Sequence, residues 1–344
     1  MQSQAERKDI LNNFPGIPPF PEDVSTAPLL RLSSEKLLEG DPAEHRRLFQ
    51  ASTEIGFFYL DLSDSDQGSS LLGDADDLFQ VGEKLFELSL EEKNQYDFSE
   101  QNSYFGYKAQ GAAVVDKQRN LDRIEFYNVS KDDIMGISDP LPAPETLHKS
   151  RARLGSFMQG SHAIVTLILD TLNDQLALPK DTLSSLHRQQ ATYRAGAAHR
   201  LWKCDGSFQP TGGLQVLPPG ADAEWVYVRP LPSHAIVNLG DAMVKFTNGL
   251  FRSNIHRVVA PPGLQAESTR YSLMYFARPE DSVMLRRLEG SDLIPTMGDG
   301  QTEEEINSKD WIIRRGLGRR VDRVNDLNFE KSAGTEQLSR RVKV

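Results

Sequence analysis

Cysteine is almost absent from this chain of 344 residues, which contains a single one, Cys204. One cysteine cannot form an intrachain disulfide, so the sequence excludes a disulfide scaffold and a cysteine-rich metal site and favours a reducing compartment. Long hydrophobic runs are also missing. The most apolar stretch, 163–169, is too short to cross a bilayer, and the first residues lack the apolar segment of a signal peptide. We therefore expect a cytoplasmic protein with no membrane-bound segment.

Basic residues are outnumbered by acidic ones. Lys and Arg total 39 against 49 Asp and Glu, which gives a formal net charge of −10. A chain this acidic is repelled by phosphate backbones and anionic lipids, so we expect neither a nucleic-acid nor a membrane partner. The hydrophobic content of 38% and charged content of 26% are typical of a globular protein. A globular enzyme or binding protein remains.

The first half of the chain predicts a proline-rich arm followed by helices and short strands. Residues 14–21 are rich in proline and indicate an extended arm lying on the domain. Ser33 to Glu35 predicts the capped start of a helix running toward Gln50, and 56–62 predicts an aromatic strand. Helical spacing of apolar residues predicts a helix over 71–86, with Gly82 as a weak point, and a long bracing helix over 149–176.

The second half is richer in β-structure. Four short runs with strand composition are separated by Pro and Gly turns, at 225–228, 235–239, 255–259 and 271–276. No helix of normal length fits between them, which excludes a parallel βαβ arrangement. An antiparallel sandwich or jelly roll is favoured. A terminal helix is expected around 311–315.

Two of these runs carry side chains suited to binding chemistry. His256 lies in the segment Asn254–Val259, and Arg270 and Ser272 lie two positions apart, on one face of a strand. Imidazole is a common metal ligand, and an Arg/Ser pair can hold a carboxylate through charge-assisted hydrogen bonds. Taken singly, each residue is more simply explained as a core histidine or a solvated polar side chain. Their combination suggests a metal site beside an anionic co-substrate.

The order of the motifs resembles a known enzyme family. Read together, they resemble the catalytic core of the 2-oxoglutarate- and iron(II)-dependent oxygenases, in the branch that includes isopenicillin N synthase, and the match spans roughly 190–280. Residues 125–133 look closest to fungal members. The motifs are, in order, Gly213–Val216, Ile236–Asp241, Thr247–Gly249, Arg252–Ser253, His256–Val259 and Arg270–Ser272.

The resemblance implies a mainly β core with helices. That core is a double-stranded β-helix, or jelly roll, whose open mouth holds iron(II), joined to a mixed helical amino-terminal region and a carboxy-terminal helix. We expect an amino-terminal oxygenase region over 14–145, a bracing helix over 146–183, a jelly-roll core over 184–282, and a carboxy-terminal helix and tail over 283–344.

The resemblance also implies an iron(II) site built from two imidazoles and a carboxylate. His199 matches the first histidine of a His-X-Asp motif and His256 the second imidazole, but Leu201 stands where the carboxylate belongs. The next acid, Asp205, would lie about 20 Å from His199 on an extended strand. It can ligate only if residues 200–204 loop back. The expected metal ligands are therefore His199, Asp205 and His256.

The co-substrate residues follow in the same way. Arg270 matches the family arginine that pairs with the distal carboxylate of 2-oxoglutarate, Ser272 its hydroxyl partner, and Tyr193 a tyrosine that also touches this co-substrate. His234 is expected in a turn, as a surface residue without a role. Residues 200–210 lack the apolar strand expected before Gly212.

These residues imply a 2-oxoglutarate-dependent dioxygenase that uses dioxygen to hydroxylate, desaturate or cyclise a small organic molecule, with the fungal likeness indicating secondary metabolism. Two alternatives stay open. One is a non-catalytic jelly-roll binding protein that has lost the carboxylate ligand. The other is an isopenicillin-type oxidase that does not use 2-oxoglutarate.

Overall fold

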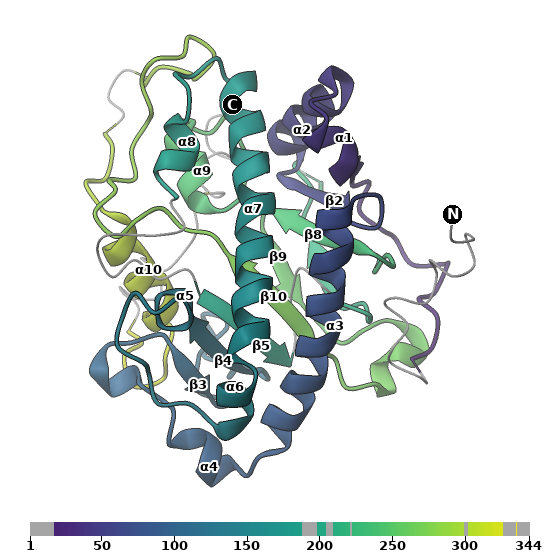
Figure 1. Ribbon diagram of the computed structural model, residues 1–344, viewed down its shortest axis with the longest axis vertical. Helices are drawn as coiled ribbons and strands as arrows, with labels where there is room; N and C mark the ends of the chain where they lie inside the picture. The colour runs from purple at the N-terminus through teal and green to yellow at the C-terminus, as the bar shows by residue number, and fades with distance from the viewer. Residues whose placement is uncertain are drawn as a thin grey trace.

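A computed structural model describes residues 17–187, 198–203, 209–220, 222–298, 302–325 and 335, with the backbone alone for 198–203 (Figure 1). The helices are α1 (Ser34–Leu38), α2 (Pro42–Glu54), α3 (Asp66–Glu87), α4 (Leu90–Asn94), α5 (Lys131–Ile134), α6 (Glu145–Lys149), α7 (Arg151–Gln175), α8 (Thr182–Ser185), α9 (Asp241–Phe246) and α10 (Ser308–Leu317). The strands are β1 (Arg31–Ser33), β2 (Phe57–Asp61), β3 (Gly106–Lys108), β4 (Glu125–Ser130), β5 (Ala198–Lys203), β6 (Leu214–Val216), β7 (Val226–Tyr227), β8 (His234–Asn238), β9 (His256–Val258) and β10 (Ser272–Phe276).

The described strands form three small sheets, with strand orders β1-β2-β8, β10-β5-β4-β3 and β7-β6-β9. Strand β1 pairs with β2 in parallel, and the other pairings are antiparallel. The antiparallel core predicted from the sequence is confirmed at this level, and the described residues form no closed barrel.

Strand β2 lies between two hydrophobic cores because its side chains alternate. Phe58 and Leu60 point into the larger core, which the helices cover. Phe57 and Tyr59 point the other way into a smaller core shared with β6 and β8. All four side chains are buried, which gives a layered order of helices, the β1-β2-β8 sheet and the β7-β6-β9 sheet. His256 lies at the edge of this smaller core, beside Phe57.

Helices α7 and α3 run side by side across the sheets (Figure 1). The stripe predicted on the long helix is confirmed, since Phe157, Ile164, Ile168 and Leu172 are all buried. Gly82, expected as a weak point, is buried within an uninterrupted α3. Helix α7 packs mainly against α3 and α2, and its predicted role in bracing the sheets stays a prediction.

Two helices stand where the sequence predicted a single one. The segment predicted to run from Ser33 toward Gln50 breaks after Leu38, and a new helix begins at Pro42. Gly40 takes a left-handed φ of +74°, and the Asp41 carboxylate accepts hydrogen bonds from the backbone N–H of Ala43 and Glu44, both at 2.8 Å. A left-handed glycine ends a helix, and a capping aspartate before proline starts one.

Two further expectations were wrong. His234 is not a surface residue in a turn, because it opens β8 and is 6% exposed. Its Nδ1–H donates to the carbonyl of Pro232 at 2.6 Å, and its Nε2 accepts from the Arg31 guanidinium at 3.0 Å. The stretch after His199, read as lacking a strand, contains β5 between β4 and β10.

The two ends of the described chain pack on the core as expected. The arm contacts the β7-β6-β9 sheet, where the Phe20 and Tyr227 ring centroids lie 6.2 Å apart. The terminal helix is confirmed as α10, and its basic residues form local ion pairs, including Arg314 with Glu304 at 2.5 Å. None of the helices in the described ranges is long and apolar enough to cross a membrane.

Candidate oxygenase site

Arg270 is the centre of the best-defined polar group near the core strands. Its side chain is 3% exposed and lies just before β10. Its Nη1 donates to the Ser272 hydroxyl at 3.0 Å, its Nε to the carbonyl of Gly212 at 2.7 Å, and its Nη2 to the Gln209 side-chain carbonyl. The Arg270 and Ser272 pair predicted on one strand face is therefore present.

Gly213 is required for this arrangement. It takes a left-handed φ of +109°, and a Cβ atom placed on it would lie 2.6 Å from the Val259 carbonyl oxygen and 3.3 Å from Arg270 Nε. Any larger residue would be strained and would push the guanidinium away. The glycine lets the start of β6 lie against both β9 and Arg270.

The buried guanidinium has no carboxylate within ion-pair distance among the described residues. Its three partners, from Gly212, Gln209 and Ser272, are all neutral. Beside it, Gln209 Nε2 and Thr211 Oγ1 are buried without a hydrogen-bond partner in the described part of the chain. A buried charge is stable only when it is compensated, so this group is suited to an anion.

His256 lies at the open end of the smaller core. It pairs with Val216 on β6, its ring is exposed, and its centroid lies 5.3 Å from that of Phe57. Its Nδ1 lies 3.2 Å from the Asn254 carbonyl oxygen, so Nδ1–H can donate there and leave the Nε2 lone pair free. The Asn254 side-chain amide is buried with no partner among the described residues. The free Nε2 lone pair of His256 and the buried Asn254 amide near it both fit a metal site at His256.

The remaining predicted site residues are described only in part. His199 and Leu201 lie in β5, where His199 pairs with Tyr275 and Leu201 with Leu273 of β10. Ser272 is an odd number of positions from both partners, so it belongs to the other face of β10. Asp205 and Tyr193 lie outside the described residues. The structure therefore joins Arg270 to Ser272, while the grouping of His199 with Asp205 and His256 stays a prediction.

No complete metal centre lies within the described part of the chain. Among the side chains described there, no three from His, Cys, Asp or Glu lie close enough to hold a metal ion. Of the three expected ligands, His256 alone has a described side chain.

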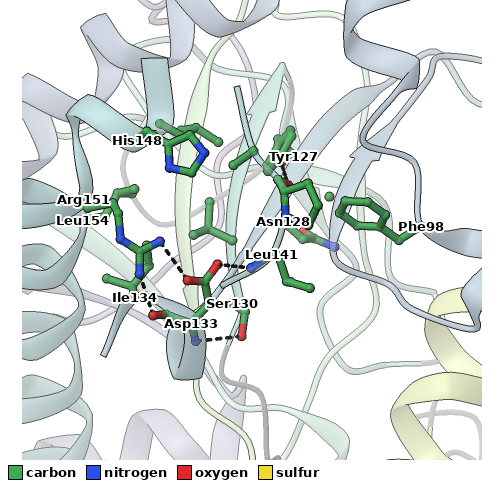
Figure 2. Close-up of a pocket in the computed structure, with 15 residues that line it drawn as sticks. Phe98, Tyr127, Asn128, Ser130, Asp133, Ile134, Leu141, His148, Arg151 and Leu154 are labelled. Atoms are coloured by element: carbon green, nitrogen blue, oxygen red, sulfur yellow. Dashed lines mark hydrogen bonds and ion pairs between the residues drawn. The ribbon is translucent and has the colours of Figure 1, made fainter. Parts of the chain in front are cut away.

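A cavity lies away from these residues (Figure 2). It is partly open to solvent and is lined mainly by apolar side chains of β4, α5, α6 and α7. Asp133 and Arg151 face each other in Figure 2 and form an ion pair at 2.7 Å, so its main charges are compensated. Neither Arg270 nor His256 lines it, and we do not assign it to the oxygenase site.

Sequence reasoning missed the residues that fix Arg270. Gln209 and Gly212 are 61 and 58 positions away from it along the chain. Gln265 is a buried residue whose side-chain carbonyl accepts from the Gly212 N–H at 2.8 Å. The paired glycines before Leu214 are the signal that could have indicated a close backbone contact.

Comparison with known proteins adds three kinds of likeness. Residues 27–149 match the amino-terminal region of the non-haem dioxygenases in morphine synthesis, and 204–279 match the 2OG-Fe(II) oxygenase superfamily. A 2-oxoglutarate-dependent dioxygenase of Aspergillus fumigatus is 31% identical over 345 residues, covering 88% of each chain.

Two solved structures show that the fold is shared. The crystal structure of a full-length Neurospora crassa protein in complex with alpha-KG has a TM-score of 0.66 at 21% identity and covers 86% of this chain and 97% of its own. The structure of JOX2 with 2OG, Fe and JA has a TM-score of 0.63 at 19% identity and covers 97% of this chain and 98% of its own. The chain belongs to the 2-oxoglutarate- and iron(II)-dependent oxygenases, an enzyme family whose cofactor is iron(II) and whose co-substrate is 2-oxoglutarate.

Proposed function

We propose that this chain is a 2-oxoglutarate-dependent dioxygenase that hydroxylates, desaturates or cyclises a small organic molecule, in fungal secondary metabolism. The three described sheets are proposed to be parts of a double-stranded β-helix. When bound, iron(II) and 2-oxoglutarate would activate dioxygen, which is the oxidant, and the protein supplies binding and orientation.

The observation that carries the proposal is the buried Arg270 without a carboxylate partner in the described chain. Its present acceptor on Nη2 is the neutral Gln209 carbonyl. A hydrogen bond to a carboxylate is roughly twice as strong as one to a neutral carbonyl, so an incoming carboxylate replaces Gln209 favourably. We propose that Arg270 and Ser272 hold the distal carboxylate of 2-oxoglutarate, with Tyr193 as a further contact.

The proposed metal ligands are His199, Asp205 and His256. Support comes from His256, whose ring is exposed at the end of the smaller core with Nδ1 directed at a backbone carbonyl. Outer-sphere hydrogen bonds of this kind orient metal-binding imidazoles in proteins. The carboxylate partner is proposed to be Asp205, because Leu201 cannot bind a cation. Residues 200–203 are extended in β5, so the return of the chain toward His199 would have to come after Lys203.

A second candidate function rests on Leu201. It lies two positions after His199 in the same strand, where a carboxylate is required for the metal site. Loss of that ligand removes one coordination bond and one negative charge. The chain would then be a binding protein that keeps the fold without the oxidation chemistry.

Anaerobic titration of the apo-protein with iron(II), with and without 2-oxoglutarate, tests both candidates. A visible charge-transfer band with stoichiometric iron supports the dioxygenase, and substrate screening follows. Weak iron binding without a band favours the non-catalytic protein. Stoichiometric iron with no response to 2-oxoglutarate would point instead to an oxidase of the isopenicillin type.

The surrounding assignments are proposals as well. We propose the segments 14–145, 146–183, 184–282 and 283–344 as the functional divisions of the chain. We also propose a cytoplasmic location, because the chain has a single cysteine, and no nucleic-acid partner, because its formal net charge is −10.

A further inference from the structure

We propose that Gln265 is a positioning residue for Arg270, and that it links the amino-terminal arm to 2-oxoglutarate affinity. This inference rests on the proposed role of Arg270 in holding the co-substrate. Gln265 lies in the short 3₁₀ helix Gly263–Glu267 and is 2% exposed.

The link is a continuous series of hydrogen bonds. The Gln265 Nε2 donates to the carbonyl of Pro18 in the arm at 2.8 Å, and its Oε1 accepts from the Gly212 N–H at 2.8 Å. The Gly212 carbonyl in turn accepts from Arg270 Nε at 2.7 Å. One buried amide therefore fixes the peptide on which the guanidinium rests, and both of its polar atoms are used.

Steric contact supports the same link. A Cβ atom placed on Gly212 would lie 2.6 Å from Phe20 Cε2 and 3.0 Å from Pro262 Cδ. The glycine is thus held between the arm and the 3₁₀ helix segment on one side, while its carbonyl meets Arg270 on the other. The arm is part of the wall behind the arginine.

The arm is itself held in place by Arg229, which follows β7. The Arg229 guanidinium lies 5.1 Å from the Phe20 ring centroid and bonds Glu22 at 2.8 Å. Release of the arm removes the Pro18 acceptor and the Phe20 contact together. Arg270 would then keep its charge and lose its fixed plane, which matters for two-point recognition of a carboxylate.

The test compares co-substrate affinity in single variants of the full-length chain. Gln265→Met keeps the length of the side chain and removes both hydrogen bonds, and Phe20→Ala removes the arm's contact with Gly212. We expect Gln265→Met to weaken 2-oxoglutarate binding by about 5- to 20-fold, the loss of one or two hydrogen bonds. Phe20→Ala should weaken it in the same direction through the lost contact. Iron(II) affinity should stay within about twofold, because neither Gln265 nor Phe20 is a proposed metal ligand.

Asn173→Leu is the matched control. Asn173 is also a buried amide, and it bonds the Leu183 N–H and the Pro179 carbonyl, both at 3.1 Å, near the end of α7. It should lower the melting temperature without changing 2-oxoglutarate affinity. Unchanged affinity in Gln265→Met, in a protein where Arg270→Gln abolishes binding, overturns the inference and leaves the proposed function intact.

A wild-type protein that binds no 2-oxoglutarate would refute the proposed function instead. The link between the residues is then measured by a double-mutant cycle of unfolding stability with Gln265→Met and Arg270→Gln. Residues that share one hydrogen-bonded peptide are expected to be non-additive. Additive effects would refute the positioning role.

Discussion

The Tyr275 Oη atom of β10 lies 3.1 Å from Nδ1 of His162 on α7, which ties the long helix to the strand that carries Ser272. Burial first, and then the nearby charge of Lys131, lowers the pKa of His162 to about 4. An unfolded histidine titrates near 6.5, so the unfolded chain binds a proton below that pH while the folded chain does not.

We therefore predict that the contribution of His162 to stability is complete above about pH 6.5 and is lost as the pH falls toward 4. The loss is on the order of 2 kcal/mol once solvent screening is allowed for. Urea unfolding at pH 7.5 and pH 5 measures it. His162→Gln should flatten the difference between the two pH values, whereas Tyr275→Phe, which keeps the ring buried, should retain it. An equal loss of stability in wild type and His162→Gln would refute the prediction.

Removing the fork of Arg270 should weaken co-substrate binding. Arg270→Lys keeps the charge but replaces a planar, multidentate donor with a single ammonium group. We expect Arg270→Lys to weaken 2-oxoglutarate binding by more than about tenfold, and Ser272→Ala to weaken it by about three- to tenfold. The measurement is the KM or Kd for 2-oxoglutarate. A larger loss of affinity in Ser272→Ala than in Arg270→Lys would contradict the assignment of Arg270 as the main contact to the carboxylate.

The carboxylate ligand can be located by two substitutions. If Asp205 completes the iron site, Asp205→Ala should weaken iron(II) binding by more than about tenfold, while the exposed Asp222→Ala should not. Isothermal titration with iron(II) under argon gives both values. The contrary result is an unaffected Asp205→Ala together with a gain of binding in Leu201→Asp, which would identify the present chain as deficient at position 201.

Two glycines of α3 should respond in opposite directions to alanine. A Cβ on exposed Gly73 meets nothing within 4 Å, whereas one on Gly68 would lie 2.2 Å from the Leu62 carbonyl oxygen. Gly73→Ala should stabilise the protein by about 0.5–1 kcal/mol through helix propensity. Gly68→Ala should destabilise it by displacing the chain that enters the helix. The melting temperatures of the two variants test this. A stabilised Gly68→Ala would contradict the prediction and would show that the backbone at Leu62 can move aside.

Periodic elements were predictable because local composition determines them. The stripe on α7 and the runs that became β8, β9 and β10 were recovered within a few residues. The break between α1 and α2 could also have been predicted from the sequence. Gly40 ends the first helix, Asp41 caps the second, and Pro42 lies in its first turn. The break was missed because the spacing of apolar residues was followed across it.

The site was predictable only where its partners are neighbours in sequence. Arg270 lies two positions before Ser272, the first residue of β10, and this spacing alone places them together. The contacts of Arg270 with Gly212, and of His234 with Arg31, join positions 58 and 203 residues apart, and no local pattern encodes them. The burial of His234 depends on the same long-range pairing of β8 with β2.

The amino-terminal strands complete the sheets of the second half. Strand β2 pairs with β8 along its whole length, and β4 does the same with β5. Two sheets therefore each combine strands from the matched stretches 27–149 and 204–279. A hybrid that joins the first half of one relative to the second half of another must therefore satisfy both strand registers at once. Exchange of whole halves between relatives is therefore expected to disrupt both sheets, whereas changes in loops and side chains would leave the strand pairing intact.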